Sequence, residues 1–81
     1  MKITKRNYEA MKFQYDPWKQ QLVFHTKDGK EMVLELLRKD REFYLITVES
    51  TEEVKGMKAI DEKINAMIDS KEIVDMYIDS L

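Results

Sequence analysis

The sequence predicts an α+β domain: an antiparallel β-meander of three or four strands, followed by two C-terminal α-helices packed on the sheet. Asp28-Gly29 separates two apolar-rich runs, which is the strongest short signal for a β-hairpin. A third apolar run follows at 42–50, and the last third of the chain has apolar residues at helical spacing. With 81 residues there is room for one such core, so we expect a single domain over residues 1–81.

The segment before the first expected strand allows two structures. Met11, Phe13 and Tyr15 alternate with polar residues, which is typical of a strand over residues 8–15. The alternative is a short helix that begins after Thr4, whose hydroxyl is suited to cap the first turn. We expect the strand, which would bring the sheet to four strands.

The meander itself is expected over residues 19–26, 30–38 and 42–50. A two-residue turn at Asp28-Gly29 would place His25 opposite Met32. Counting outward in this register makes both faces of the sheet apolar, and the second face then includes Phe24 and Tyr44. Two short helices cover one face of such a sheet well. We therefore expect the helices to split between the faces, or else a partner or second copy of the chain to cover the second face.

The C-terminal third carries two helix signals. Ser50 and Glu53 form a capping box, and an apolar stripe follows it. Asp69-Ser70-Lys71-Glu72 is a second start signal, and the apolar residues after it are spaced one, three, one and three apart. The members of the two stripes are Val54, Met57, Ile60, Ile64, Met67 and Ile68, then Ile73, Val74, Tyr77, Ile78 and Leu81.

The second of these helices would present an acidic row. Its four carboxylates are three, three and four residues apart and would line one helical face. Met76 lies off the apolar stripe, so we expect it to be exposed beside them. Together with the second sheet face, this row is the predicted partner-binding surface: Asp69, Glu72, Asp75, Asp79, Met76, Phe24 and Tyr44.

The residue types exclude several kinds of site. The chain has no cysteine and a single histidine, His25, so zinc sites built from thiolates or several histidines are ruled out. It has only two glycines, too few for a P-loop or a dinucleotide-binding loop. Every serine lies at an expected helix cap or at the C-terminus, away from His25. We expect no enzymatic activity, no cofactor and no metal.

Charge is distributed unevenly along the chain. Residues 1–48 carry ten basic and seven acidic side chains, whereas residues 49–81 carry four and nine. The basic residues near the N-terminus lie among aromatic ones, which makes nucleic-acid binding an alternative function. The net charge of −2 and a pI of about 5.4 argue against it. The residues of this N-terminal patch are Lys2, Lys5, Arg6, Tyr8, Lys12 and Phe13.

The leading functional hypothesis is a protein-binding module that occupies a basic surface of its partner. Residues 1–11 lack the apolar segment of a secretory signal and no long apolar run follows, so we expect a cytoplasmic protein without membrane attachment. In size, acidity and strand-then-helix order, the chain resembles small phage or mobile-element inhibitors such as anti-CRISPR proteins. That resemblance implies a partner with a basic nucleic-acid channel, such as a host nuclease. The second alternative is a structural homodimer closed through one sheet face.

Overall fold

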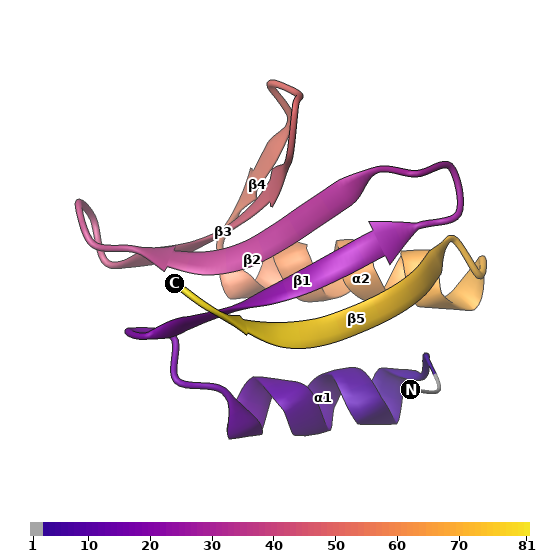
Figure 1. Cartoon of the computed structure of the whole chain (residues 1–81), viewed down its shortest axis with the longest axis horizontal. Coiled ribbons are helices and arrows are strands. Elements are labelled where there is room, and N and C mark those ends of the chain that lie inside the picture. Colours follow the sequence, from indigo (N-terminus) through magenta and orange to yellow (C-terminus); the bar gives the residue numbers. More distant parts are fainter. Residues whose placement is uncertain (1–2) are drawn as a thin grey trace.

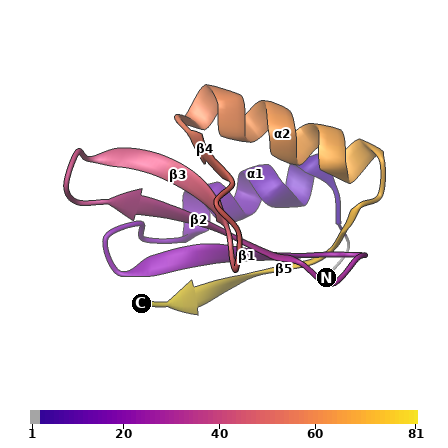
Figure 2. The same ribbon diagram turned by 90° about the horizontal axis from the view of Figure 1, so that it is seen from above.

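A five-stranded antiparallel sheet with two helices on one face makes up the domain. The computed structural model describes residues 3–81. The elements follow in the order α1 (Lys5–Gln14), β1 (Gln20–Thr26), β2 (Glu31–Leu37), β3 (Glu42–Thr47), β4 (Glu53–Lys55), α2 (Met57–Asp69) and β5 (Ile73–Ser80). The strand order is β4-β3-β2-β1-β5. Both helices lie on the same side of the sheet, and no layer formed by residues 3–81 covers its other side (Figure 1, Figure 2).

The expectation of a strand over residues 8–15 is wrong, because residues 8–14 belong to α1 and Tyr15 is its C-cap. Thr4 caps the helix: its hydroxyl oxygen accepts a hydrogen bond from the backbone N–H of Asn7 at 3.1 Å. Tyr8, Met11 and Tyr15 are buried at spacings of three and four, which is the helical period. Phe13, which the alternating pattern grouped with Met11 and Tyr15, is 89% exposed. The helical spacing was therefore present in the sequence beside the misleading alternation.

The three meander strands are confirmed, but the register of the first pair differs by one residue from the expected one. Gly29 has a φ of 86°, and the N–H of Thr26 donates to the carbonyl of Lys30 at 2.9 Å. The turn therefore contains three residues, a common hairpin loop with glycine in the left-handed region. Phe24 consequently lies opposite Met32, and His25 lies opposite Glu31.

This one-residue difference exchanges the two faces of β1 relative to β2, so Phe24 joins the face under the helices and Val23 the face opposite. A slip of one residue moves every side chain of a strand to the other face of the sheet. The corrected register gathers the large apolar side chains of the strands under the two helices. There the ring of Tyr8 meets Phe24 edge-on, with 6.0 Å between centroids. The fully buried side chains are Tyr8, Phe24, Leu22, Leu34, Leu45, Ile60, Ile64 and Met76.

The helix expected after Ser50 begins later than its capping box. Ser50 accepts a hydrogen bond from the N–H of Glu52 at 3.1 Å within a turn, and Val54 then pairs with Leu45 in the short strand β4. The chain enters α2 at Gly56, whose φ of 92° and ψ of 136° suit only glycine. From there the expected stripe holds, because Ile60, Ile64 and Ile68 are buried.

Gly56→Ala is expected to lower the free energy of unfolding by about 1–3 kcal/mol, the cost of forcing a Cβ-bearing residue into this region. In the helix interior expected from the sequence, the same change would raise stability by about 1 kcal/mol. No atom lies within 4 Å of an added Cβ, so the loss would come from backbone strain alone. Urea denaturation followed by circular dichroism measures the difference, and a gain in stability would contradict this backbone conformation.

The expectation of a second C-terminal helix is wrong, because residues 73–80 form strand β5. α2 ends at Asp69 in a Schellman motif: the N–H of Glu72 donates to the carbonyl of Met67 at 2.9 Å, and that of Lys71 to Ile68 at 3.1 Å. Lys71 takes the left-handed φ of 61° that glycine usually supplies. The sequence therefore lacks the glycine that normally marks a helix end.

A β-bulge explains why β5 resembles a helix in the sequence. Thr26 pairs with Ile73 and His25 with Asp75, so Val74 is an extra residue on β5. The bulge places the buried residues Ile73 and Met76 three positions apart, which imitates a helical spacing. α2 leads from β4 at one edge of the sheet to β5 at the opposite edge, where β5 pairs with β1 (Figure 1).

Candidate binding surface on the open face of the sheet

The sheet face opposite the helices, which we call the open face, has no covering layer among the described residues (Figure 2). Its members follow from the register, since directly opposed residues share a face and alternate residues along a strand return to it. They are Gln21, Val23 and His25 of β1, Glu31, Val33, Glu35 and Leu37 of β2, Glu42, Tyr44 and Ile46 of β3, Glu53 and Lys55 of β4, and Asp75, Tyr77 and Asp79 of β5.

The charge of the open face is one-sided. Its strand positions carry six carboxylates and one lysine. The whole chain has a formal charge of only −2, so the rest of the molecule carries an excess of positive charge. The excess of negative charge on this face is largest toward β5, because two lysines supply positive charge near β3. The amines of Lys39 and Lys55 both lie over the ring of Tyr44, at 5.7 and 5.8 Å from its centroid.

The part of the open face on β5, β1 and β2 we call the acidic half. Its floor is apolar: Val23 and Val33 are paired across β1 and β2 and are 2% and 9% exposed. The ring of Tyr77 lies beside them and is 37% exposed. The side chains around the two valines leave them almost no exposed surface, so the exposed apolar part of this surface is the ring of Tyr77, with acidic groups around it. The acidic half comprises Val23, His25, Glu31, Val33, Glu35, Asp75, Tyr77 and Asp79.

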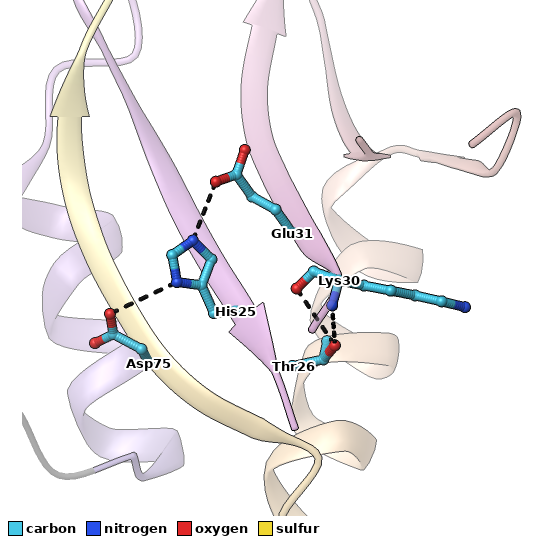
Figure 3. A network of polar contacts seen from close by, with 5 residues as sticks. All are labelled: His25, Thr26, Lys30, Glu31 and Asp75. Atoms are coloured by element: carbon cyan, nitrogen blue, oxygen red, sulfur yellow. Dashed lines mark hydrogen bonds and ion pairs between the residues drawn. The ribbon is translucent and has the colours of Figure 1, made fainter. Parts of the chain in front are cut away.

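His25 joins three strands within the acidic half. Its Nε2 lies 3.0 Å from Glu31 on β2, and its Nδ1 lies 3.9 Å from Asp75 on β5 (Figure 3). The register expected from the sequence places Met32 opposite His25. In the structure Glu31 lies opposite His25 instead, so that expectation is wrong. The two carboxylates meet opposite nitrogens of the ring, so they do not converge on one ion. Among residues 3–81, no group of three His, Cys, Asp or Glu side chains is arranged to hold a metal.

The acidic groups act together on Tyr77. Partial burial is the largest of the causes that raise the pKa of the Tyr77 hydroxyl. The negative charges of Glu31, Asp79 and Asp75 raise this pKa further. Carboxylates from β2 and β5 thus act on the same ring. Their field attracts a cation brought to this place.

Tyr44, another predicted partner-binding residue, lies at the opposite half of the open face. Its hydroxyl donates to Asp40, and this hydrogen bond raises the pKa of Tyr44 and lowers that of Asp40. Lys55 lies 3.6 Å from the same carboxylate. The side chain of Tyr44 is only 6% exposed, because these neighbours cover it. Its polar and aromatic groups are therefore already engaged within the domain.

The predicted acidic row is not formed as one helical face. Asp69, at the end of α2, pairs with Lys5 of α1 at 2.9 Å. Glu72, in the turn before β5, accepts a hydrogen bond from the hydroxyl of Ser70. Only Asp75 and Asp79 remain on one face, four residues apart on β5 with Tyr77 midway between them. The β-branched and aromatic residues around them, typical of a strand, are the signal that could have placed them correctly.

Phe24 and Met76 lie on the opposite side of the sheet from this surface. They are 0% and 2% exposed, so the expectation that Met76 is exposed is wrong, as is the position of Phe24 on the second face. The two residues face each other across β1 and β5 beneath the helices. Their side chains are packed in the core and do not contribute to a surface in this structure.

The basic N-terminal patch is partly neutralised by carboxylates of α1 itself and of α2. Lys12 lies 2.8 Å from Asp61 and 2.9 Å from Glu9, and Lys5 pairs with Asp69. Tyr8, the aromatic residue expected among these cations, is fully buried and donates its hydroxyl hydrogen to Asp61. Lys2 lies outside the described residues.

Two hollows on the helix side of the sheet have linings that indicate a ligand less clearly than the open face does. One of about 160 Å³ lies near the 27–30 turn and the end of α2, and its lining has three lysines and three carboxylates, which gives no preference for either charge. Another of about 280 Å³ lies between α1, β3 and α2 and is mostly apolar. Its lining residues include Phe13, Tyr15, Phe43 and Met57.

No protein-family model, curated protein or solved structure matches the chain. Within the described residues, neither helix has the length and apolar character needed to cross a membrane. The open face and its charge therefore provide the basis for a functional proposal.

Proposed function

We propose that this chain is a non-catalytic binding module that uses the acidic half of its open face to bind a basic surface of another protein. The supporting observation is the concentration of Glu31, Glu35, Asp75 and Asp79 around the apolar floor of Val23 and Val33. Opposite charges steer encounter and fix orientation, while the exposed ring of Tyr77 offers an apolar contact from which a partner excludes water.

The narrower form of this proposal is an inhibitor from a phage or mobile element that occupies a basic nucleic-acid channel of a host nuclease. Small size and acidity support it. The strand-then-helix order that completed the resemblance to such inhibitors is corrected, since α1 precedes the sheet and β5 follows α2. The identity of the captured partner distinguishes this form from the general one.

Charge reversal tests the proposal. Asp75→Lys with Asp79→Lys is expected to weaken partner binding by about tenfold or more, because two attractive contacts become repulsive. Asp69→Lys with Glu72→Lys is the matched control, since it changes the net charge equally but lies off the open face. The wild-type protein and both variants are used to capture partners from the same lysate. Affinities for the purified partner are then measured at two salt concentrations.

A selective loss in the open-face variant supports the proposal, provided that both variants remain folded by circular dichroism. Equal losses in the two variants would mean that net charge alone decides binding. A larger loss in the control would move the binding surface to the end of α2. A wild-type chain that captures no protein and is a dimer in solution, or that shifts DNA in a gel, would contradict the proposal in favour of the corresponding alternative.

A further inference from the structure

The free edge of β5 offers a second means of contact beside the acidic half. β5 is the last strand of the sheet and pairs with β1 on one side, while no described strand lies on its other side. An edge strand presents a row of backbone N–H and C=O groups that can pair with another extended segment. The edge is therefore a template on which a partner segment can add a strand.

The two edges of the sheet differ in how they are protected. β4, at the opposite edge, has only three residues, and short edge strands offer few groups for pairing. β5 has eight residues and contains neither lysine nor proline, two residue types that commonly protect edges. Its bulge at Val74 lies near its start, so the stretch from Asp75 to Ser80 remains regular.

The side chains of residues 75–80 determine which charge a segment paired with this edge should carry. Asp75, Tyr77 and Asp79 occupy alternate positions and point to the open face, where directly opposed residues of an added strand would lie beside them. Opposite charges attract at such positions and like charges repel. A second copy of β5 is poorly suited, because its sequence Ile73–Ser80 contains no basic residue to place against either aspartate.

We propose that β5 accepts an extended segment of the partner as a sixth strand, and that this segment carries Lys or Arg at two positions four residues apart, with an apolar residue midway. The cations lie opposite Asp75 and Asp79, and the apolar residue lies against Tyr77. This inference rests on the proposed function, since it specifies how the basic partner engages the acidic half of the open face.

Three synthetic peptides of equal charge test strand addition to the intact chain. The first, acetyl-Thr-Lys-Thr-Val-Thr-Lys-Thr-amide, places both lysines and the valine on one face of a strand. The second, acetyl-Thr-Lys-Thr-Val-Lys-Thr-Thr-amide, has the same composition but sends its lysines to opposite faces. The third is the first peptide methylated at the backbone nitrogens of valine and its neighbouring threonines, which blocks pairing at both of its edges. Affinity and the hydrogen exchange of the β5 amides are measured by NMR.

The first peptide is expected to bind about tenfold more tightly than either of the others and to slow exchange of the β5 amides. Equal binding of all three with unchanged exchange would overturn strand addition. So would failure of all three to bind. In either case the proposed function survives if Asp75→Lys with Asp79→Lys still weakens partner capture selectively. Slow β5 exchange without peptide, together with a dimer mass in solution, would assign the edge to a second copy and overturn the inference.

Discussion

Phe24→Ala is expected to lower the free energy of unfolding by about 3–5 kcal/mol, the usual cost of removing a buried phenylalanine ring. Phe24 is fully buried, lies opposite Met32 and Met76 on its two neighbouring strands, and meets the ring of Tyr8. Its removal would leave a cavity where α1 packs against the centre of the sheet. Because domains are stable by only about 5–15 kcal/mol, the variant is expected to be partly unfolded near physiological temperature.

Phe13→Ala is the matched control, since Phe13 is 89% exposed and its removal is expected to change stability by less than about 0.5 kcal/mol. Urea denaturation of the two variants, followed by far-ultraviolet circular dichroism, measures both effects. The comparison separates a core role of Phe24 from the partner-binding role predicted from the sequence. A Phe24→Ala protein that keeps wild-type stability but loses its partner would restore the sequence-based hypothesis.

Stability is expected to fall steeply with increasing pH above about 10, where tyrosines of the unfolded chain ionise. Burial raises the pKa of Tyr15 to about 12. Burial, followed by the hydrogen bond to Asp61, raises the pKa of Tyr8 still further above its ordinary range. In this pH range the native state holds phenolic protons that the unfolded state has lost. Each tyrosine then contributes a loss of about 1.4 kcal/mol per pH unit.

The Tyr15 contribution is present in full below pH 10 and is lost by about pH 12, whereas the Tyr8 contribution continues to decline beyond that pH. Tyr8→Phe is therefore expected to reduce the loss of stability between pH 10 and 11 by about 1 kcal/mol, because the unfolded phenol is not yet fully ionised there. Urea midpoints at pH 9, 10 and 11 give the slope, and absorbance at 295 nm reports ionisation of the phenols. An unchanged slope in the Tyr8→Phe variant would show that Tyr8 ionises normally in the folded protein.

The acidic half of the open face was only partly predictable from the sequence. The acidity of the C-terminal third and the relation of Asp75 to Asp79 were visible, and both residues remain in the candidate surface. Glu31 and His25, which come from other strands, were not associated with them. Their contact depends on the pairing of β1 with both β2 and β5, which brings distant parts of the chain to one face (Figure 3).

The sequence by itself determined the local elements whose signals agree with one another. The strands around Asp28-Gly29, the strand that follows them, and the apolar stripe of Ile60, Ile64 and Ile68 all appear where expected. The sequence also indicated the helix cap at Thr4, although the alternation of apolar and polar residues around Met11 and Phe13 indicated a strand instead. In these segments neighbouring residues set both the backbone conformation and the buried side.

Tertiary structure alone decided the register of the first hairpin and the strand conformation of β5. A third residue in the turn is as compatible with Asp28-Gly29 as two, and it exchanges the two faces of β1 relative to β2. A bulged strand and a helix produce nearly the same spacing of apolar residues. For β5 the choice is made by β1, which lies far earlier in the chain and supplies hydrogen bonds and a buried face that only a strand can meet. Local periodicity contains no information about such a partner.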